Sequence, residues 1–474
     1  MAVPRRPNIV FVLTDDHATN AIGCYGSQVN ETAGIDAIAA AGARFDTALV
    51  ENALCTPSRA AILTGTYSHT SGVTTLATGM SDDHATFVTA LKDAGYRTAI
   101  FGKWHLGHGP GYDPAGFDHW EVLPDQGEYH DPEFLTAGGR IRRPGYATDI
   151  ITERALEWMR AQGEEPYCVL IWHKAPHRPW QPHPKLLDDP QPDLLVPPTF
   201  RDDYAGRGTP AHHATMRIAD DLTDIDLKGG PDAELGYAEL AVWKYQRYLR
   251  DYLRCVASVD ESVAAVAAAL REWGQWDDTL TIYASDQGFY LGEHGWFDKR
   301  FMYEESLRMP LVMSYPARIP AGAVSDALVS NVDIAPTILD AAGIPAPADM
   351  QGASLLPLVT GWATAIRDAH YYRFYEHDDH MHHVWAHYGI RTDRYKLIYY
   401  YADGMGLPNT SDVTYAPEWE LFDLREDPHE LHSRHLDPDH AHVRAELTRR
   451  LWELQRELGD APHPRQPVPE GCAP

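Results

Sequence analysis

The stretch NIVFVLTDD, residues 8–16, decides the fold class of this chain. It is a short apolar run that stops abruptly at polar residues, which is typical of a buried strand. Later runs follow the same pattern and also end in polar side chains: YRTAIF at 96–101, YCVLIW at 167–172 and LTIYA at 280–284. Helical patterns separate these runs. The sequence therefore predicts an α/β fold with a large mixed, mostly parallel sheet flanked by helices.

The pattern also predicts how the chain is organised. Helices are expected at 32–43, 85–95, 148–163 and 240–274. Residues 182–235 are rich in Pro, Asp and Gly, which indicates a long loop or insertion on the side of the active site. Strands at 387–402 and 419–424 and a helix at 441–458 follow later. We therefore expect a catalytic domain, 1–367, and a smaller α+β C-terminal subdomain with an antiparallel sheet, 368–474.

Composition excludes several classes of partner. The 474 residues carry a formal net charge of −28, which argues against nucleic acid, because phosphate binding needs a basic surface. No apolar run approaches the length of a membrane span. The five cysteines are irregularly spaced and are expected to be reduced thiols. The first apolar run is too short for a secretory signal, so we expect a cytoplasmic protein, or a periplasmic or secreted one if a signal was removed.

Polar groups follow the ends of the predicted strands, which is where ligands bind in sheets of this class. Asp15 and Asp16 follow the first run, and Asp286 and Gln287 follow the last. Each pair taken singly is compatible with a solvated turn. Because oxygen donors suit a hard cation, their shared position predicts a Ca²⁺ or Mg²⁺ site rather than a zinc site.

The stretch NALCTPSRAAILTG, residues 52–65, predicts a helix that begins at Cys55. Pro57 suits a first turn, Gly65 suits a helix end, and Arg59 lies one turn beyond the cysteine. Helix N–H groups and a guanidinium would favour an anion beside the sulfur, so Cys55 is expected to be reactive. Further cations and imidazoles would complete a clamp for sulfate or phosphate transfer: Lys103, His105, His177 and Lys299.

Together these stretches resemble one enzyme family. CTPSRAAILTG matches the C-x-P-S-R-x-x-x-L-T-G signature of type I sulfatases in the alkaline-phosphatase superfamily, and GKWHLG, 102–107, resembles their second signature. Further stretches resemble family blocks in the family's order, from about residue 7 to about residue 435: NIVFVLTDD, HKAPHRPW, DQGFYLGEHGWFDKR, VDIAPTILDAAG and LFDLREDPHE. The resemblance implies an alkaline-phosphatase-like fold and a sulfuric ester hydrolase.

The resemblance also implies the chemistry of residue 55. In sulfatases a dedicated maturase oxidises the motif cysteine to formylglycine, whose hydrate is a geminal diol. One hydroxyl of the diol attacks the sulfate sulfur and the alcohol leaves, and the second hydroxyl then expels sulfate. An unmodified thiol lacks that second hydroxyl and cannot complete the cycle.

Matching positions imply a calcium site in which residue 55 is joined by the oxygens at the strand ends: Asp15, Asp16, Asp286 and Gln287. Many sulfatases have Asn or His where this chain has Gln287, but an amide oxygen still binds calcium. By the same resemblance Asp286 is also a candidate acceptor for the proton of the attacking hydroxyl.

The remaining roles follow in the same way. Arg59 and Lys103 would hold the diol and the sulfate, and His105 would be the base for the second hydroxyl. His177, with Lys299, would contact the sulfate and act as general acid for the leaving alcohol. His173 is the rival of His177, because HKAPH contains both histidines.

The closest resemblance is to bacterial N-acetylglucosamine-6-sulfatase-like enzymes, which act on sulfated carbohydrates of mucins or glycosaminoglycans. The histidine-dense run at 372–389 is a candidate lining of the sugar pocket, with a second metal site or a solvated loop as alternatives. The candidate substrate contacts are His173, Arg373, His377 and His387, with His380, His382, His383 and Arg391 nearby.

Two other functions stay open. Phosphonate monoester and phosphodiester hydrolases share this architecture and sometimes the modified cysteine. A non-catalytic protein that binds sulfated glycans would result if Cys55 remains a thiol.

Overall fold

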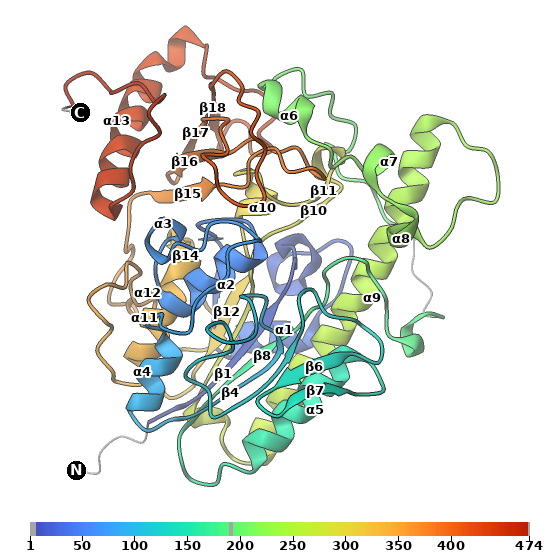
Figure 1. Ribbon diagram of the computed structural model, residues 1–474, viewed down its shortest axis with the longest axis vertical. Coiled ribbons are helices and arrows are strands. Elements are labelled where there is room, and N and C mark those ends of the chain that lie inside the picture. Colours follow the sequence, from blue (N-terminus) through green and yellow to red (C-terminus); the bar gives the residue numbers. More distant parts are fainter. Residues whose placement is uncertain (1–5, 189–192, 473–474) are drawn as a thin grey trace.

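The computed structural model describes residues 6–188 and 193–472, and its centre is a ten-stranded sheet (Figure 1). The strand order is β13-β2-β12-β9-β1-β8-β4-β5-β6-β7. The five neighbouring strands in the middle are parallel: β9 (Thr279–Ser285), β1 (Asn8–Thr14), β8 (Tyr167–Trp172), β4 (Arg97–Lys103) and β5 (His119–Leu123). The predicted α/β class with a mixed, mostly parallel sheet is confirmed.

The outer strands make the sheet mixed. On one side β12 (Leu311–Ser314) runs antiparallel to β9 and is followed by β2 (Ala43–Phe45) and β13 (Ala323–Ser325). On the other side β6 (Glu133–Thr136) and β7 (Gly139–Arg142) are added antiparallel. The four apolar runs identified in the sequence are all central strands, because a strand covered on both faces needs apolar side chains at every position.

Side chains of β1 alternate between two cores, one on each face of the sheet. Val10 and Val12 pack with α1 (Ala33–Ala41), α5 (Ala147–Arg160) and α9 (Tyr237–Glu272). Ile9, Phe11 and Leu13 pack on the opposite face with α2 (Cys55–Thr64), α4 (Phe87–Asp93) and α11 (Ile334–Ala341). The predicted helices at 32–43, 85–95, 148–163 and 240–274 therefore correspond to α1, α4, α5 and α9.

A small antiparallel sheet forms near the C-terminus, as expected. Its strands lie in the order β15 (His370–Phe374), β16 (His387–Arg391), β17 (Tyr395–Tyr400) and β18 (Glu418–Asp423). Helix α13 (Ala441–Leu458) packs on it, and together they form the end of the molecule that lies opposite the N-terminus in Figure 1. The division of the chain between residues 367 and 368 stays a prediction.

The remaining elements are short. The insertion at 182–235 carries α6 (Thr209–His213), α7 (Ile218–Asp221) and α8 (Asp224–Leu227), and its residues 189–192 lie outside the described residues. The other short helices are α3 (Ser68–Ser71), α10 (Glu304–Leu307) and α12 (Leu356–Val359), and the two-residue strands are β3 (Ala48–Leu49), β10 (Tyr290–Leu291), β11 (Phe297–Asp298) and β14 (Val329–Ser330).

Two expectations from composition can be compared with this fold. All five cysteines lie in the described part of the chain and are free thiols. Among residues 6–188 and 193–472, no helix combines the length and the apolar character that a membrane crossing requires.

The carboxyl ends of the central strands meet at one edge of the sheet. Thr14 at the end of β1 pairs with Ser285 at the end of β9, and Leu13 pairs with Trp172 at the end of β8. Gly102, next to Lys103 in β4, has a φ of +107°, and a Cβ there would lie 1.9 Å from the carbonyl oxygen of Trp172. Glycine at this position lets β4 approach β8 and deliver Lys103 to the same edge.

Replacing Gly102 by alanine is expected to lower the free energy of unfolding by about 2–4 kcal/mol, because the new methyl group overlaps backbone and the φ is unfavourable. Gly230→Ala is the control, since a Cβ at Gly230 meets no heavy atom within 4 Å. Urea unfolding measures both. Equal midpoints for the two variants would contradict the close approach of β4 and β8.

Candidate active site

Cys55 is the first residue of α2, as the sequence predicts. Leu54 before it is extended, and the helix ends at Gly65, which is left-handed with a φ of +66°. The Cys55 side chain is buried, and its thiol donates to the Asp15 carboxylate over 3.4 Å. Burial, and then the charge of Asp15, raise the pKa of the thiol to about 12. Burial therefore outweighs the helix N-terminus and keeps the unmodified thiol weakly acidic, and the reactivity expected of this position stays a prediction.

Arg59 points from α2 into the sheet edge and is completely buried. Its Nε donates to Asp286 over 3.0 Å and one terminal nitrogen donates to Asp15 over 3.1 Å. The other terminal nitrogen donates to the carbonyl oxygen of Lys103 over 2.7 Å. The guanidinium also lies 5.3 Å from the ring centroid of Trp172. Arg59 thus holds two carboxylates in place, a role that the sequence did not indicate.

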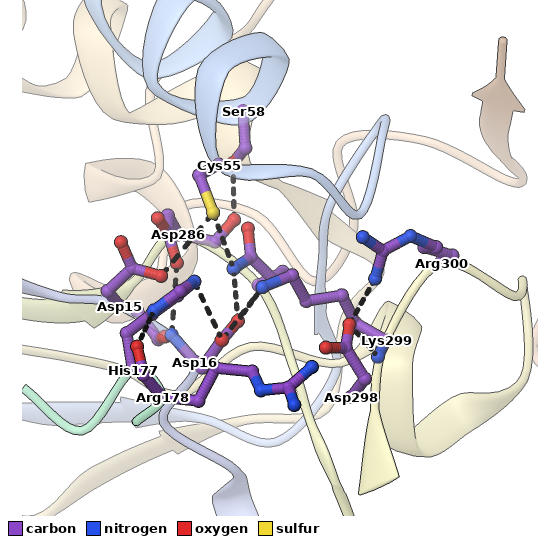
Figure 2. A network of polar contacts seen from close by, with 12 residues as sticks. Asp15, Asp16, Cys55, Ser58, His177, Arg178, Asp286, Asp298, Lys299 and Arg300 are labelled. Atoms are coloured by element: carbon purple, nitrogen blue, oxygen red, sulfur yellow. Dashed lines mark hydrogen bonds and ion pairs between the residues drawn. The ribbon is translucent and has the colours of Figure 1, made fainter. Parts of the chain in front are cut away.

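Three buried carboxylates converge below Cys55, as Figure 2 shows: Asp15, Asp16 and Asp286. Each offers an oxygen within 4.8 Å of the others. Burial and neighbouring carboxylates raise the pKa of Asp16 to about 6 and that of Asp286 to about 7. Burial also raises the pKa of Asp15, but this effect is outweighed by nearby cations, first of all Lys103. They hold the pKa of Asp15 well below its usual value.

The donor set fits a hard divalent cation. Gln287 lies beside the carboxylates, with Nε2 2.6 Å from Asp16 and 3.7 Å from the Cys55 sulfur. Its buried Oε1 finds no hydrogen-bond partner among the described residues. A cation among these oxygens would relieve the repulsion that raises the carboxyl pKa values and would give the amide oxygen a partner. The predicted metal ligands are therefore brought together.

Two lysines reach the same carboxylates. Lys299 Nζ lies 2.6 Å and 2.7 Å from the two oxygens of Asp16 (Figure 2). Burial lowers the pKa of the Lys299 ammonium, but the charge of Asp16 and other anions outweighs burial, so the pKa of Lys299 is raised. Lys103 Nζ contacts Asp15 and Gln126. Gln126 was not identified from the sequence, because nothing in its surroundings marks it.

The structure also separates the two histidines of HKAPH. His177 Nε2 lies 3.7 Å from Asp16, and its Nδ1 donates to the carbonyl oxygen of Arg178 over 2.6 Å (Figure 2). His173 is fully buried and its Nε2 contacts Ser262 of α9 over 3.0 Å instead. Of the two rivals, His177 is the one that lies in the carboxylate cluster, so the expected substrate contact of His173 is not supported.

His105 follows β4 and contacts Thr56 in the first turn of α2. Its carbonyl oxygen accepts a hydrogen bond from Thr56 over 2.9 Å, and its Nδ1 lies 3.4 Å from the same hydroxyl. Burial, and then the charge of Lys103, hold the pKa of both His105 and His177 well below the usual value. Both imidazoles are therefore neutral at pH 7.

Family models match nearly the whole of this structure. Residues 7–344 match the model described as sulfatase, and residues 292–457 match the model described as N-sulphoglucosamine sulphohydrolase, C-terminal. The chain belongs to the sulfatase family. It is a sulfatase, a hydrolase of sulfate esters, and the buried carboxylate cluster lies within the first matched segment.

Individual relatives agree with the family. The sulfatase is 41% identical to an N-acetylglucosamine-6-O-sulfatase of Bacteroides thetaiotaomicron, over 96% of this chain and 87% of the relative. It also resembles a solved protein in complex with its substrate D-glucosamine-2-N,6-O-disulfate, with 40% identity, a TM-score of 0.88 and coverage of 96% and 98% of the two chains. A phosphonate monoester hydrolase from Silicibacter pomeroyi shares the fold, with 22% identity, a TM-score of 0.73 and coverage of 95% and 96%.

The histidines and arginine predicted to contact substrate in the C-terminal part of the sulfatase have internal partners instead. Arg373 is buried and contacts both oxygens of Asp460, at 2.6 Å and 2.7 Å. His377 is buried and bonds to backbone groups of Val413 and Ala386. Both side chains therefore have partners inside the C-terminal part of the chain, and their expected contact with substrate stays a prediction.

His387 is likewise closed to a substrate. It is fully buried, accepts from the backbone N–H of Met302 over 3.1 Å and donates to the carbonyl oxygen of Trp385 over 2.7 Å. Nearby Arg391 pairs with Glu304 over 3.3 Å. His377 and His387 therefore take part in the internal hydrogen bonding of a turn and a strand.

One histidine of this run does approach the cluster. His382 Nε2 lies 3.6 Å from Asp298. Asp298 pairs with Arg300, and Figure 2 shows this pair beside Lys299. Asp298 and Arg300 have φ values of +78° and +94°. The sequence analysis named His382 but missed Asp298 and Arg300, although the charged triplet DKR in the aromatic stretch GWFDKRFMY was a signal that could have found them.

Replacing Arg59 by alanine is expected to lower the free energy of unfolding by about 3–5 kcal/mol, because Asp15 and Asp286 would lose a buried partner. Urea unfolding measures this effect, and a chelator is added so that a bound cation does not stabilise the carboxylates. Cys55→Ala is the control, with an expected change of about 1 kcal/mol or less. If the two variants unfolded at the same urea concentration, the bridging role of Arg59 would be wrong.

Proposed function

We propose that this sulfatase removes the 6-O-sulfate from N-acetylglucosamine or a related glucosamine residue of a sulfated glycan. The observation that carries the proposal is the convergence of the signature cysteine with carboxylates, lysines and imidazoles in one buried cluster. The substrate class is supported by the Bacteroides thetaiotaomicron relative and by the solved protein bound to a glucosamine disulfate.

Residue 55 is proposed to act as formylglycine, whose hydrate supplies a nucleophilic hydroxyl and a second hydroxyl for release of sulfate. The neutral thiol of Cys55 supports the need for this modification, since a thiol with its pKa raised to about 12 is a poor nucleophile. Because the entire helix α2 is buried, a maturase would have to reach Cys55 before the chain folds.

Calcium is the proposed cation, with Mg²⁺ as the alternative. Asp15, Asp16, Asp286 and Gln287 would hold it, and their oxygen-only donor set supports calcium over zinc. When bound, the cation would supply positive charge against the oxygens of the reacting sulfuryl group.

The other side chains have roles that fit their contacts. Lys103 and Lys299 would bind the sulfate oxygens, and the neutral His105 imidazole would accept a proton from the second hydroxyl. Asp286 would accept the proton of the attacking hydroxyl. His177 would protonate the leaving alcohol, because a negatively charged sulfate ester beside Nε2 favours the protonated imidazole.

The sugar would lie next to Lys299. Asp298, Arg300 and His382 form a polar group there, and carboxylate and guanidinium groups suit the hydroxyls of a sugar. This placement replaces the pocket that the sequence located at Arg373, His377 and His387.

The peptide that contains residues 52–65 is expected to lose sulfur and two hydrogens and to gain oxygen when the protein is made together with a maturase. Intact-peptide mass measures the exchange, and the modified protein should then desulfate N-acetylglucosamine 6-sulfate. Cys55→Ala should reduce turnover to background. A peptide that keeps cysteine beside an active maturase would favour the non-catalytic, glycan-binding alternative, and a clear preference for an aryl phosphodiester over an aryl sulfate would favour the phosphodiesterase alternative.

Chelation of divalent cations is expected to abolish turnover, and calcium should restore it. Calcium should also raise Tm, since a ligand at about 100 times its Kd stabilises the folded state by about 2.7 kcal/mol. Asp16→Asn should lose both effects. If chelation changed neither turnover nor Tm, the carboxylate cluster would not be a metal site.

A further inference from the structure

The turn that carries His177 is held by a backbone carbonyl. The carbonyl oxygen of Arg178 accepts from His177 Nδ1 over 2.6 Å and from Lys174 Nζ over 3.4 Å. A hydrogen bond from Nδ1 keeps the proton on that nitrogen and leaves Nε2 directed toward Asp16, 3.7 Å away. The place of the Arg178 carbonyl therefore sets both the tautomer and the direction of the imidazole.

The side chain of Arg178 is in turn held by the insertion at 182–235. Its guanidinium donates to both oxygens of Asp226, with Nε at 3.0 Å, and lies 5.1 Å from the ring centroid of Phe297. Such a two-point pair restricts the direction of the guanidinium as well as its distance. Phe297 and Asp298 form β11, and Lys299 follows directly, so Arg178 links the His177 turn to the strand that precedes Lys299.

Asp226 is itself fixed. It is buried, and one of its oxygens accepts from the backbone N–H and the hydroxyl of Thr223, over 3.0 Å and 2.8 Å. The next residues of α8 are tied to α9: Arg247 donates to the carbonyl oxygen of Leu227 over 2.9 Å, and Lys228 pairs with Asp251 over 2.7 Å. A continuous series of polar contacts therefore runs from α9 through Asp226 and Arg178 to His177.

We infer that Asp226 is a positioning residue for His177, acting through the side chain of Arg178. The insertion would then serve catalysis by aiming the imidazole that protonates the leaving alcohol. The inference rests on the general-acid role of His177 in the proposed function. A displaced imidazole should slow only those substrates whose leaving group needs a proton.

Two sulfate esters test this with modified, calcium-loaded enzyme. N-Acetylglucosamine 6-sulfate releases a poorly acidic alcohol, whereas 4-nitrophenyl sulfate releases a stable phenolate that needs no proton. Asp226→Asn should lower kcat for the sugar sulfate by about tenfold to a hundredfold and change kcat for the nitrophenyl ester by less than about twofold. The ratio of the two rates does not depend on the fraction of folded enzyme, so partial unfolding cannot produce this result.

Three further variants complete the design. Arg178→Lys, which keeps the charge and loses the two-point contact, should shift the ratio in the same direction as Asp226→Asn. His177→Ala should shift it further, and Asp226→Asn should add nothing in the His177→Ala background. Asp423→Asn is the matched control, because the buried Asp423 forms a similar two-point pair with Arg394 in the C-terminal sheet.

The outcomes separate the two proposals. If His177→Ala lowered kcat for both esters equally, His177 would not be the general acid. The positioning role of Asp226 would then also be wrong. If His177→Ala shifted the ratio but Asp226→Asn and Arg178→Lys did not, the positioning role alone would be wrong. A raised KM for the sugar sulfate with unchanged kcat would also overturn it, because Arg178 would then contact the sugar directly.

Discussion

The buried guanidinium of Arg59 is the interaction on which the rest of the site depends. It joins α2 to the ends of three strands at once, through Asp15 after β1, Asp286 after β9 and the carbonyl oxygen of Lys103 in β4. Removing one member of a buried ion pair leaves an uncompensated charge, which costs more than the pair contributes. This interdependence explains why the cysteine, the carboxylates and the lysines occupy one compact cluster.

The site is also held in an unfavourable backbone conformation. Four of its non-glycine residues have positive φ: Asp16 at +66°, His105 at +57°, Asp298 at +78° and Arg300 at +94°. Each such residue costs on the order of 1–3 kcal/mol, which the surrounding cores on both faces of the sheet must offset. Asp16 follows the end of β1 and His105 follows the end of β4, so two of these residues lie where a central strand enters the site. Other residues with positive φ lie elsewhere in the described chain, but these four belong to the site and its immediate surroundings.

The C-terminal part of the chain shows how a polar-rich sequence can serve packing rather than binding. Arg373 is paired with Asp460 and lies 4.6 Å from the ring centroid of Tyr375, and His377 and His387 bridge backbone groups. Only the partner across the fold shows whether such a side chain is free, and that partner is distant in the sequence. His382 is the member of the run that turns toward the site, and nothing in the local sequence distinguishes it from His380 or His383.

The sequence by itself determined the fold class, the central strands, helix α2 and the set of residues at the strand ends. These are local properties, since a strand buried on both faces is apolar at every position and parallel strands deliver their ends to one edge. Only the tertiary structure decided that Arg59 pairs with two buried carboxylates, that the Cys55 thiol stays neutral, and that His177 rather than His173 faces the carboxylate cluster. The physical reason is that charge pairing and burial involve segments that are distant in the sequence: Lys299 and Asp16 are 283 positions apart. A local sequence pattern does not indicate which polar groups will be buried together.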